Sequence, residues 1–107
     1  MKQILKFEVT LDENHLPLDI QMNANNNSQI EKNIKALMIS AWAANSKETL
    51  RIDLWTKDMP MHDMYITYHQ TLTAMASSLE KATGQDKLAD ALRDYCNFFA
   101  EKTKISG

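Results

Sequence analysis

The sequence has little glycine and proline, with two of each among 107 residues. Average proteins contain about 12% of the two together, so a collagen, a Gly/Ser linker and a Pro-rich disordered chain are excluded. No Gly-x-Gly occurs, which argues against a glycine-rich phosphate-binding loop. The single cysteine, Cys96, cannot form an internal disulfide, and its place in a helical pattern predicts a buried thiol.

Long apolar runs and an excess of basic charge are also missing. No run of about 18 apolar residues exists, so we expect no membrane insertion. Lys6 and Glu8 interrupt the N-terminal stretch too early for a signal peptide. The net charge of −2 and the pI near 5.9 argue against nucleic-acid binding. We therefore expect a cytoplasmic protein that folds as a single domain over residues 1–107.

Alternation of apolar and polar residues predicts strands over residues 5–11, 18–24 and 48–56. The first two strands should form a hairpin, with Pro17 at a first-residue or edge position. The segment 36–43 is almost continuously apolar and fits a strand or a helix equally well. Its strongly alternating neighbour favours a strand, because consecutive strands usually pair.

Between the two hairpins, the asparagine-rich stretch 25–28 breaks the strand pattern. Ser28 followed by Glu31 matches a capping box, the signature of a helix N-terminus. We therefore expect a short helix over roughly residues 29–35.

The second half of the chain has helical periodicity. Apolar residues recur at spacings of three and four over residues 60–83 and 86–103. Asp58 is expected to cap the first helix, with Pro60 in its first turn and Gly84 at its end. The order of elements predicts an α+β fold: an antiparallel four-stranded sheet made of two hairpins, a short helix between them, and two C-terminal helices packed on one face.

The residues that usually carry catalysis or bind metals form no recognisable constellation. His62 and His69 are seven positions apart, about 10 Å along a helix, whereas zinc ligands on one helix are usually three or four apart. His15 lies far away in the sequence. Cys96 could pair with a histidine as a thiolate, but spacing alone does not bring them together. We expect no enzyme activity, cofactor or metal site.

The polar face of the last strand is more informative. Arg51, Asp53 and Trp55 alternate with leucine and isoleucine, so the three should share one face. Tryptophan beside arginine is typical of protein–protein interfaces. These three residues are the candidate partner-binding site. The alternative, that the helices cover this face and Trp55 belongs to the core, remains open.

Four segments carry a family resemblance: TLRIDLWTKDMPMHDM (49–64), YHQTLTAMA (68–76), EKATG (80–84) and RDYCNFFAEK (93–102). With them, nearly the whole chain resembles the gliding-motility protein GldC family. The resemblance implies a small, soluble, non-enzymatic accessory protein of the bacterial surface-gliding machinery, with no catalytic residues to carry over. The family pattern often has Trp-Asp where this chain has Trp42-Ala43, and tryptophan at Met22.

The resulting hypothesis is an accessory protein that contacts motility-apparatus components from the cytoplasmic side. A second hypothesis is a small-molecule-binding protein or enzyme with a site between sheet and helices, suggested by the histidines, Tyr65, Tyr68 and Cys96. A third possibility is a homodimer formed through the sheet edge or the methionine-rich start of the first helix.

Overall fold

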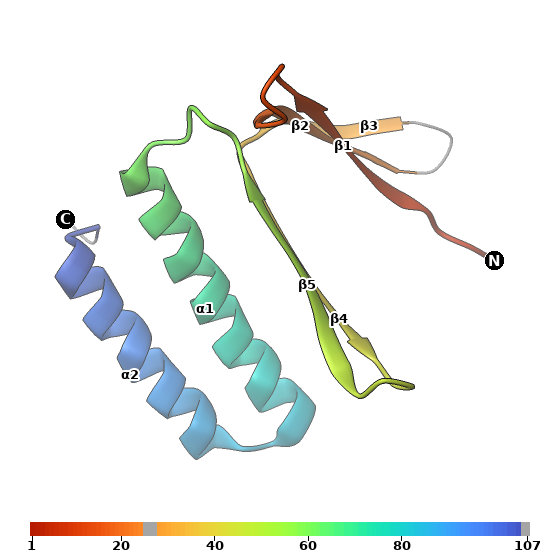
Figure 1. Ribbon diagram of the computed structural model, residues 1–107. Coiled ribbons are helices and arrows are strands. Elements are labelled where there is room, and N and C mark those ends of the chain that lie inside the picture. Colours follow the sequence, from red (N-terminus) through yellow and green to blue (C-terminus); the bar gives the residue numbers. More distant parts are fainter. Residues whose placement is uncertain (25–27, 106–107) are drawn as a thin grey trace. The chain divides into compact units, whose positions relative to one another are not determined.

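The computed structural model describes residues 1–24 and 28–105. The chain divides into two compact units, Met1–Met59 and Pro60–Gly107. The first unit contains the strands and the second contains the helices, as Figure 1 shows. We call them the strand unit and the helical unit.

The strand unit begins with an antiparallel sheet of three strands in the order β1-β2-β3. They are β1 (Leu5–Leu11), β2 (Pro17–Ala24) and β3 (Ser28–Ile34). The hairpin predicted for the first two strands is confirmed, and Pro17 is the first residue of β2. Ile20 lies opposite both Val9 and Ile34 and is fully buried, which places the core of this sheet at its central strand.

The short helix predicted over residues 29–35 is wrong, because this segment is the strand β3. A capping box contributes only about 1 kcal/mol, and helices shorter than roughly 12 residues are marginal without tertiary support. Antiparallel pairing with β2 supplies backbone hydrogen bonds that a seven-residue helix could not match. Asn25–Asn27 and the side chains of Ser28 and Glu31 lie outside the described residues.

A second sheet consists of β4 (Ala36–Ala43) and β5 (Glu48–Trp55), which pair antiparallel throughout their length. Both strands were predicted correctly. The prediction of one four-stranded sheet is wrong, since the five strands of the described residues form separate sheets of three and two. Only Lys35 separates β3 from β4, which leaves no room for the reversal that antiparallel pairing of these two strands requires.

Backbone hydrogen bonds connect the two sheets within the strand unit. The amide of Thr56 donates to the carbonyl of Lys35 at 2.8 Å, and that of Lys57 donates to the carbonyl of Pro17 at 3.0 Å. Thr56 is completely buried. The chain leaving β5 is therefore attached at two points to segments far away in the sequence.

The helical unit is an antiparallel hairpin of α1 (Met61–Thr83) and α2 (Asp86–Thr103), seen side by side in Figure 1. Gly84 ends α1 in the left-handed conformation, with φ of 71°, as its position predicted. Neither helix is long and apolar enough to span a membrane, as far as the described residues go. Small side chains are buried on both helices, namely Ala76 of α1 and Ala89, Cys96 and Ala100 of α2.

Asp58 does not cap α1, contrary to expectation. The helix begins after Pro60, whose own φ of −67° and ψ of 149° are extended. The Asp58 carboxylate instead accepts hydrogen bonds from the Thr56 hydroxyl at 2.7 Å and from the Lys35 ammonium at 3.2 Å. These interactions keep the residue with the strand unit, because both donors belong to it.

Candidate interaction surface

The three residues selected from the sequence lie on one face of β5. In an antiparallel ladder, directly opposite residues share a face, so Ala36, Met38 and Ser40 of β4 accompany Trp55, Asp53 and Arg51. Trp42, opposite Thr49, extends this face toward the hairpin turn. We call it the tryptophan face, defined by Trp42, Arg51, Asp53 and Trp55.

The side chains of the tryptophan face are accessible in the structure. Trp42 is 64% exposed and Trp55 is 51% exposed. The Arg51 guanidinium donates a hydrogen bond to the Asp53 carboxylate, with 2.6 Å between Nη2 and Oδ1. Arg51 carries five N–H donors in total, so this ion pair fixes the guanidinium while leaving it able to donate further hydrogen bonds.

A hollow of about 360 Å³ lies at one end of β5. It is lined by Asp53, Leu54 and Trp55 from the strand, and by Leu16, Pro17 and Lys57. Apolar surface dominates the lining, and the two charged side chains have opposite signs. Two of the three residues chosen from the sequence, Asp53 and Trp55, therefore border a concave surface.

The turn between β1 and β2 shapes the hollow through Asp12. One carboxylate oxygen of Asp12 accepts hydrogen bonds from the amides of Asn14 and Leu16, at 2.8 and 2.9 Å. The other accepts from the Lys57 ammonium at 2.8 Å. The hydrogen bond from Lys57, followed by that from the Leu16 amide, lowers the pKa of Asp12 below its ordinary value. The ionised carboxylate thus holds Leu16 and Pro17 beside the end of β5.

A second ionic cluster lies where β3 passes into β4. The hydrogen bond from the buried Thr56 hydroxyl is the main reason that the pKa of Asp58 is lowered, and Lys35 adds to the effect. Asp58 itself is largely exposed, so the interaction positions the backbone rather than forming a reactive centre.

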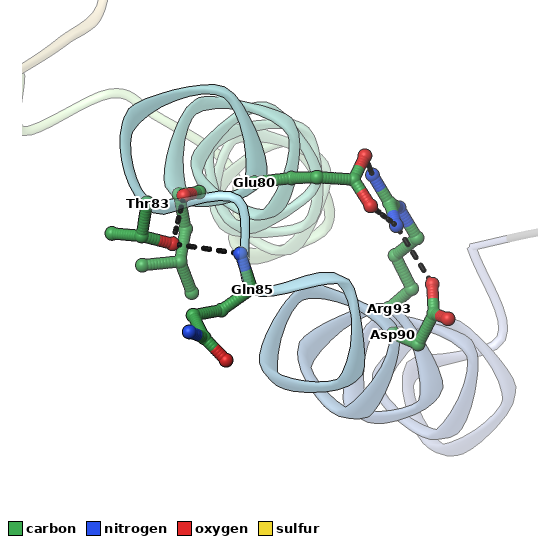
Figure 2. A network of polar contacts seen from close by, with 6 residues as sticks. Glu80, Thr83, Gln85, Asp90 and Arg93 are labelled. Carbon is green, nitrogen blue, oxygen red and sulfur yellow. Dashed lines mark hydrogen bonds and ion pairs between the residues drawn. The ribbon is translucent and has the colours of Figure 1, made fainter.

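The polar network of the helical unit has a structural role. Figure 2 shows Arg93 of α2 between Glu80 of α1 and Asp90 of its own helix. Arg93 donates to both oxygens of Glu80, at 3.0 and 3.4 Å, and to Asp90 at 2.8 Å. Glu80 and then Asp90 raise the pKa of Arg93. At the nearby turn, the Gln85 amide donates to the Thr83 hydroxyl, so the network fastens the end of the helical hairpin.

The structure also places the residues considered for catalysis. Cys96 is 3% exposed, as its helical position predicted. The His69 ring stacks on Phe99 with centroids 6.4 Å apart, and His15 occupies the β1–β2 turn with φ of 64°. In the described part of the chain, no three His, Cys, Asp or Glu side chains gather closely enough to hold a metal ion.

Sequence reasoning missed Asp12, Leu16, Pro17 and Lys57 as neighbours of the candidate residues. An aspartate at the start of a turn often accepts hydrogen bonds from the amides that follow, so the role of Asp12 within the turn was readable. Its pairing with Lys57, 45 positions away, required the three-dimensional structure.

The fold and the surface define a small α+β protein with two exposed tryptophans and an arginine–aspartate ion pair on one face of β4 and β5. A family model described as "Gliding motility-associated protein GldC-like" matches residues 17–105. The match covers most of the chain, and the chain belongs to this GldC-like family. No curated protein and no solved structure matches the chain.

Proposed function

We propose that this chain is a non-enzymatic accessory protein of the gliding-motility machinery, and that it binds a protein component of that machinery through the tryptophan face. Membership of the GldC-like family supports the association with gliding motility. The exposed pair of tryptophans beside an arginine–aspartate ion pair is the observation that supports a binding role. We place the interaction on the cytoplasmic side.

The composition and shape of this surface fit protein recognition. Tryptophan and arginine are enriched among residues that dominate binding energy, especially where a pocket lies beside them. Trp55 is a tryptophan that is half exposed, and it also lines the hollow, so it has both the residue type and the neighbouring pocket that strong binding residues share. Replacing it with alanine should therefore weaken binding by about 2 kcal/mol or more, which is at least roughly thirtyfold.

A tagged copy of the chain, expressed in a gliding bacterium and recovered with its partners, tests the proposal. We expect the wild type to recover motility components and Trp55→Ala to recover far less of them. Phe98→Ala is the matched control, since Phe98 is 52% exposed but lies on α2. Retention of the same components by a folded Trp55→Ala variant would place the contact elsewhere.

A further inference from the structure

The backbone of β5 has one open edge. In the part of the chain that the structure describes, β5 pairs with β4 alone. The amide of Thr56 donates to Lys35, and these two residues continue the register in which Trp55 lies opposite Ala36. Thr56 and Lys35 are therefore a hydrogen-bonded pair, and in an antiparallel ladder such pairs alternate with pairs whose amides and carbonyls point outward.

This alternation assigns a direction to every backbone group of β5. Leu54, Ile52 and Leu50 direct their amides and carbonyls toward β4, as Thr56 does. Arg51, Asp53 and Trp55 direct theirs to the open edge. The next outward amide, that of Lys57, confirms the direction because it donates to Pro17 on the other side.

We propose that this edge pairs with the same edge of a second copy of the chain, so that two β5 strands run antiparallel with Ile52 opposite Ile52. The proposal goes beyond the function proposed above and does not depend on it. The dimer would contain a continuous sheet of four strands, two from each copy, joined by backbone hydrogen bonds between the outward groups of Thr49, Arg51, Asp53 and Trp55.

Charge complementarity selects both the occupant and the register. With Ile52 at the centre, Arg51 lies opposite Asp53 of the second copy, and the symmetry repeats this pair. The outward backbone groups of the two strands also meet when one strand slides by two residues in either direction. These registers place Asp53 opposite Asp53 or Arg51 opposite Arg51. Like charges directly opposite are destabilising, so the pairing is self-complementary in one register. The 2.6 Å contact within each copy leaves the Arg51 guanidinium further donors for the second carboxylate.

The other face of β5 supports the same arrangement. Leu50 and Ile52 are 57% and 51% exposed, and the proposed register sets Leu50 opposite Leu54 of the second copy. At the end of the edge, Thr49 of the second copy would lie opposite Trp55, and the pairing would stop there, because the next outward amide, that of Lys57, is already bonded to Pro17. Apolar cross-strand pairs and ionic pairs thus occupy opposite faces of the joined strands.

The oligomeric state of the full chain tests the proposal. Light scattering across roughly 1–500 μM should show the mass rising from 12.3 kDa toward twice that value. A monomer mass throughout this range overturns the proposal. If the wild type dimerises, Arg51→Asp should raise the dimer Kd by about ten- to a thousandfold, because two cross-strand pairs become repulsive.

The exchanged pair R51D/D53R restores opposite charges in the same register and should restore dimerisation. Lys87→Asp, a charge reversal at an exposed position of α2, is the matched control and should leave the dimer unchanged. Circular dichroism verifies that each variant is folded. A dimer that survives Arg51→Asp, or one that the exchanged pair fails to restore, overturns the proposal and points to another surface, such as the exposed Tyr68 and Met75 of α1.

Amide hydrogen exchange reports the edge directly. The amides of Arg51 and Asp53 should gain protection as the protein concentration rises, whereas those of Leu50 and Ile52 are bonded to β4 and should be protected at every concentration. Concentration-independent exchange at Arg51 and Asp53 in a sample that dimerises overturns the proposed pairing.

Discussion

The close approach of the two helices makes a quantitative prediction for Ala76→Leu. Ala76 has no exposed surface, and the buried residues of α2 are also small: Ala89, Cys96 and Ala100. Leucine adds three carbon atoms where the helices meet, and such overpacking costs about 1–3 kcal/mol. Alanine and leucine have similar helix propensities, so the cost comes from packing.

Urea unfolding followed by the helical signal in circular dichroism measures this cost. For a small domain it corresponds to a fall in Tm of roughly 4–20 °C. Ala74→Leu is the matched control, since Ala74 lies two residues away on an exposed part of α1 and should change stability by less than about 0.5 kcal/mol. Equal effects of the two substitutions would refute the inference that the buried small residues set the helix separation.

Two further predictions concern the strand unit. Lys47 has φ of 58° in the β4–β5 turn, a conformation that glycine adopts without strain, so Lys47→Gly should raise the free energy of unfolding by about 0.5–1 kcal/mol. Ser46→Gly is the control and should lower this free energy. Urea titrations that give the same free energy of unfolding for the two variants contradict the reasoning. The lowered pKa values of Asp12 and Asp58 predict a stabilisation that is fully present above the unfolded aspartate pKa of about 3.9 and is lost as the pH falls toward the folded values. The acid limb of the stability curve should become shallower in Asp12→Asn, and an unchanged slope would show that the Lys57 pairing does not contribute to it.

Local patterns were sufficient where one element determines its own shape. The alternation around Phe7 and Ile52 identified their strands. Gly84 marked the end of α1, because the residue there adopts the left-handed backbone conformation that glycine favours. The same alternation predicts that Arg51, Asp53 and Trp55 share one face, as they do in the structure. These predictions succeed because side-chain period and backbone conformation are properties of a few consecutive residues.

The errors arose where a distant segment decides the outcome. The stretch after Ser28 carries a helix signal, but its pairing partner is β2, which no local pattern identifies. Asp58 stands where a helix cap is expected, yet Lys35 and Thr56 provide its hydrogen bonds. The hollow beside Trp55 likewise exists only because the β1–β2 turn packs against the end of β5, so the sequence of β5 alone does not predict it.

The ion pair between Asp12 and Lys57 has a consequence for the order of folding. It joins residues 45 positions apart, whereas the Glu80–Arg93 contact in the helical hairpin spans 13. Longer loops lose more entropy on closure, and chains dominated by distant contacts fold more slowly. The helical hairpin can therefore form early, because its contacts join nearby residues. The lining of the hollow is complete only after the β1–β2 turn has packed beside the end of β5. The hollow is therefore a late product of folding, although Asp53, Leu54 and Trp55 in its lining are consecutive residues of β5.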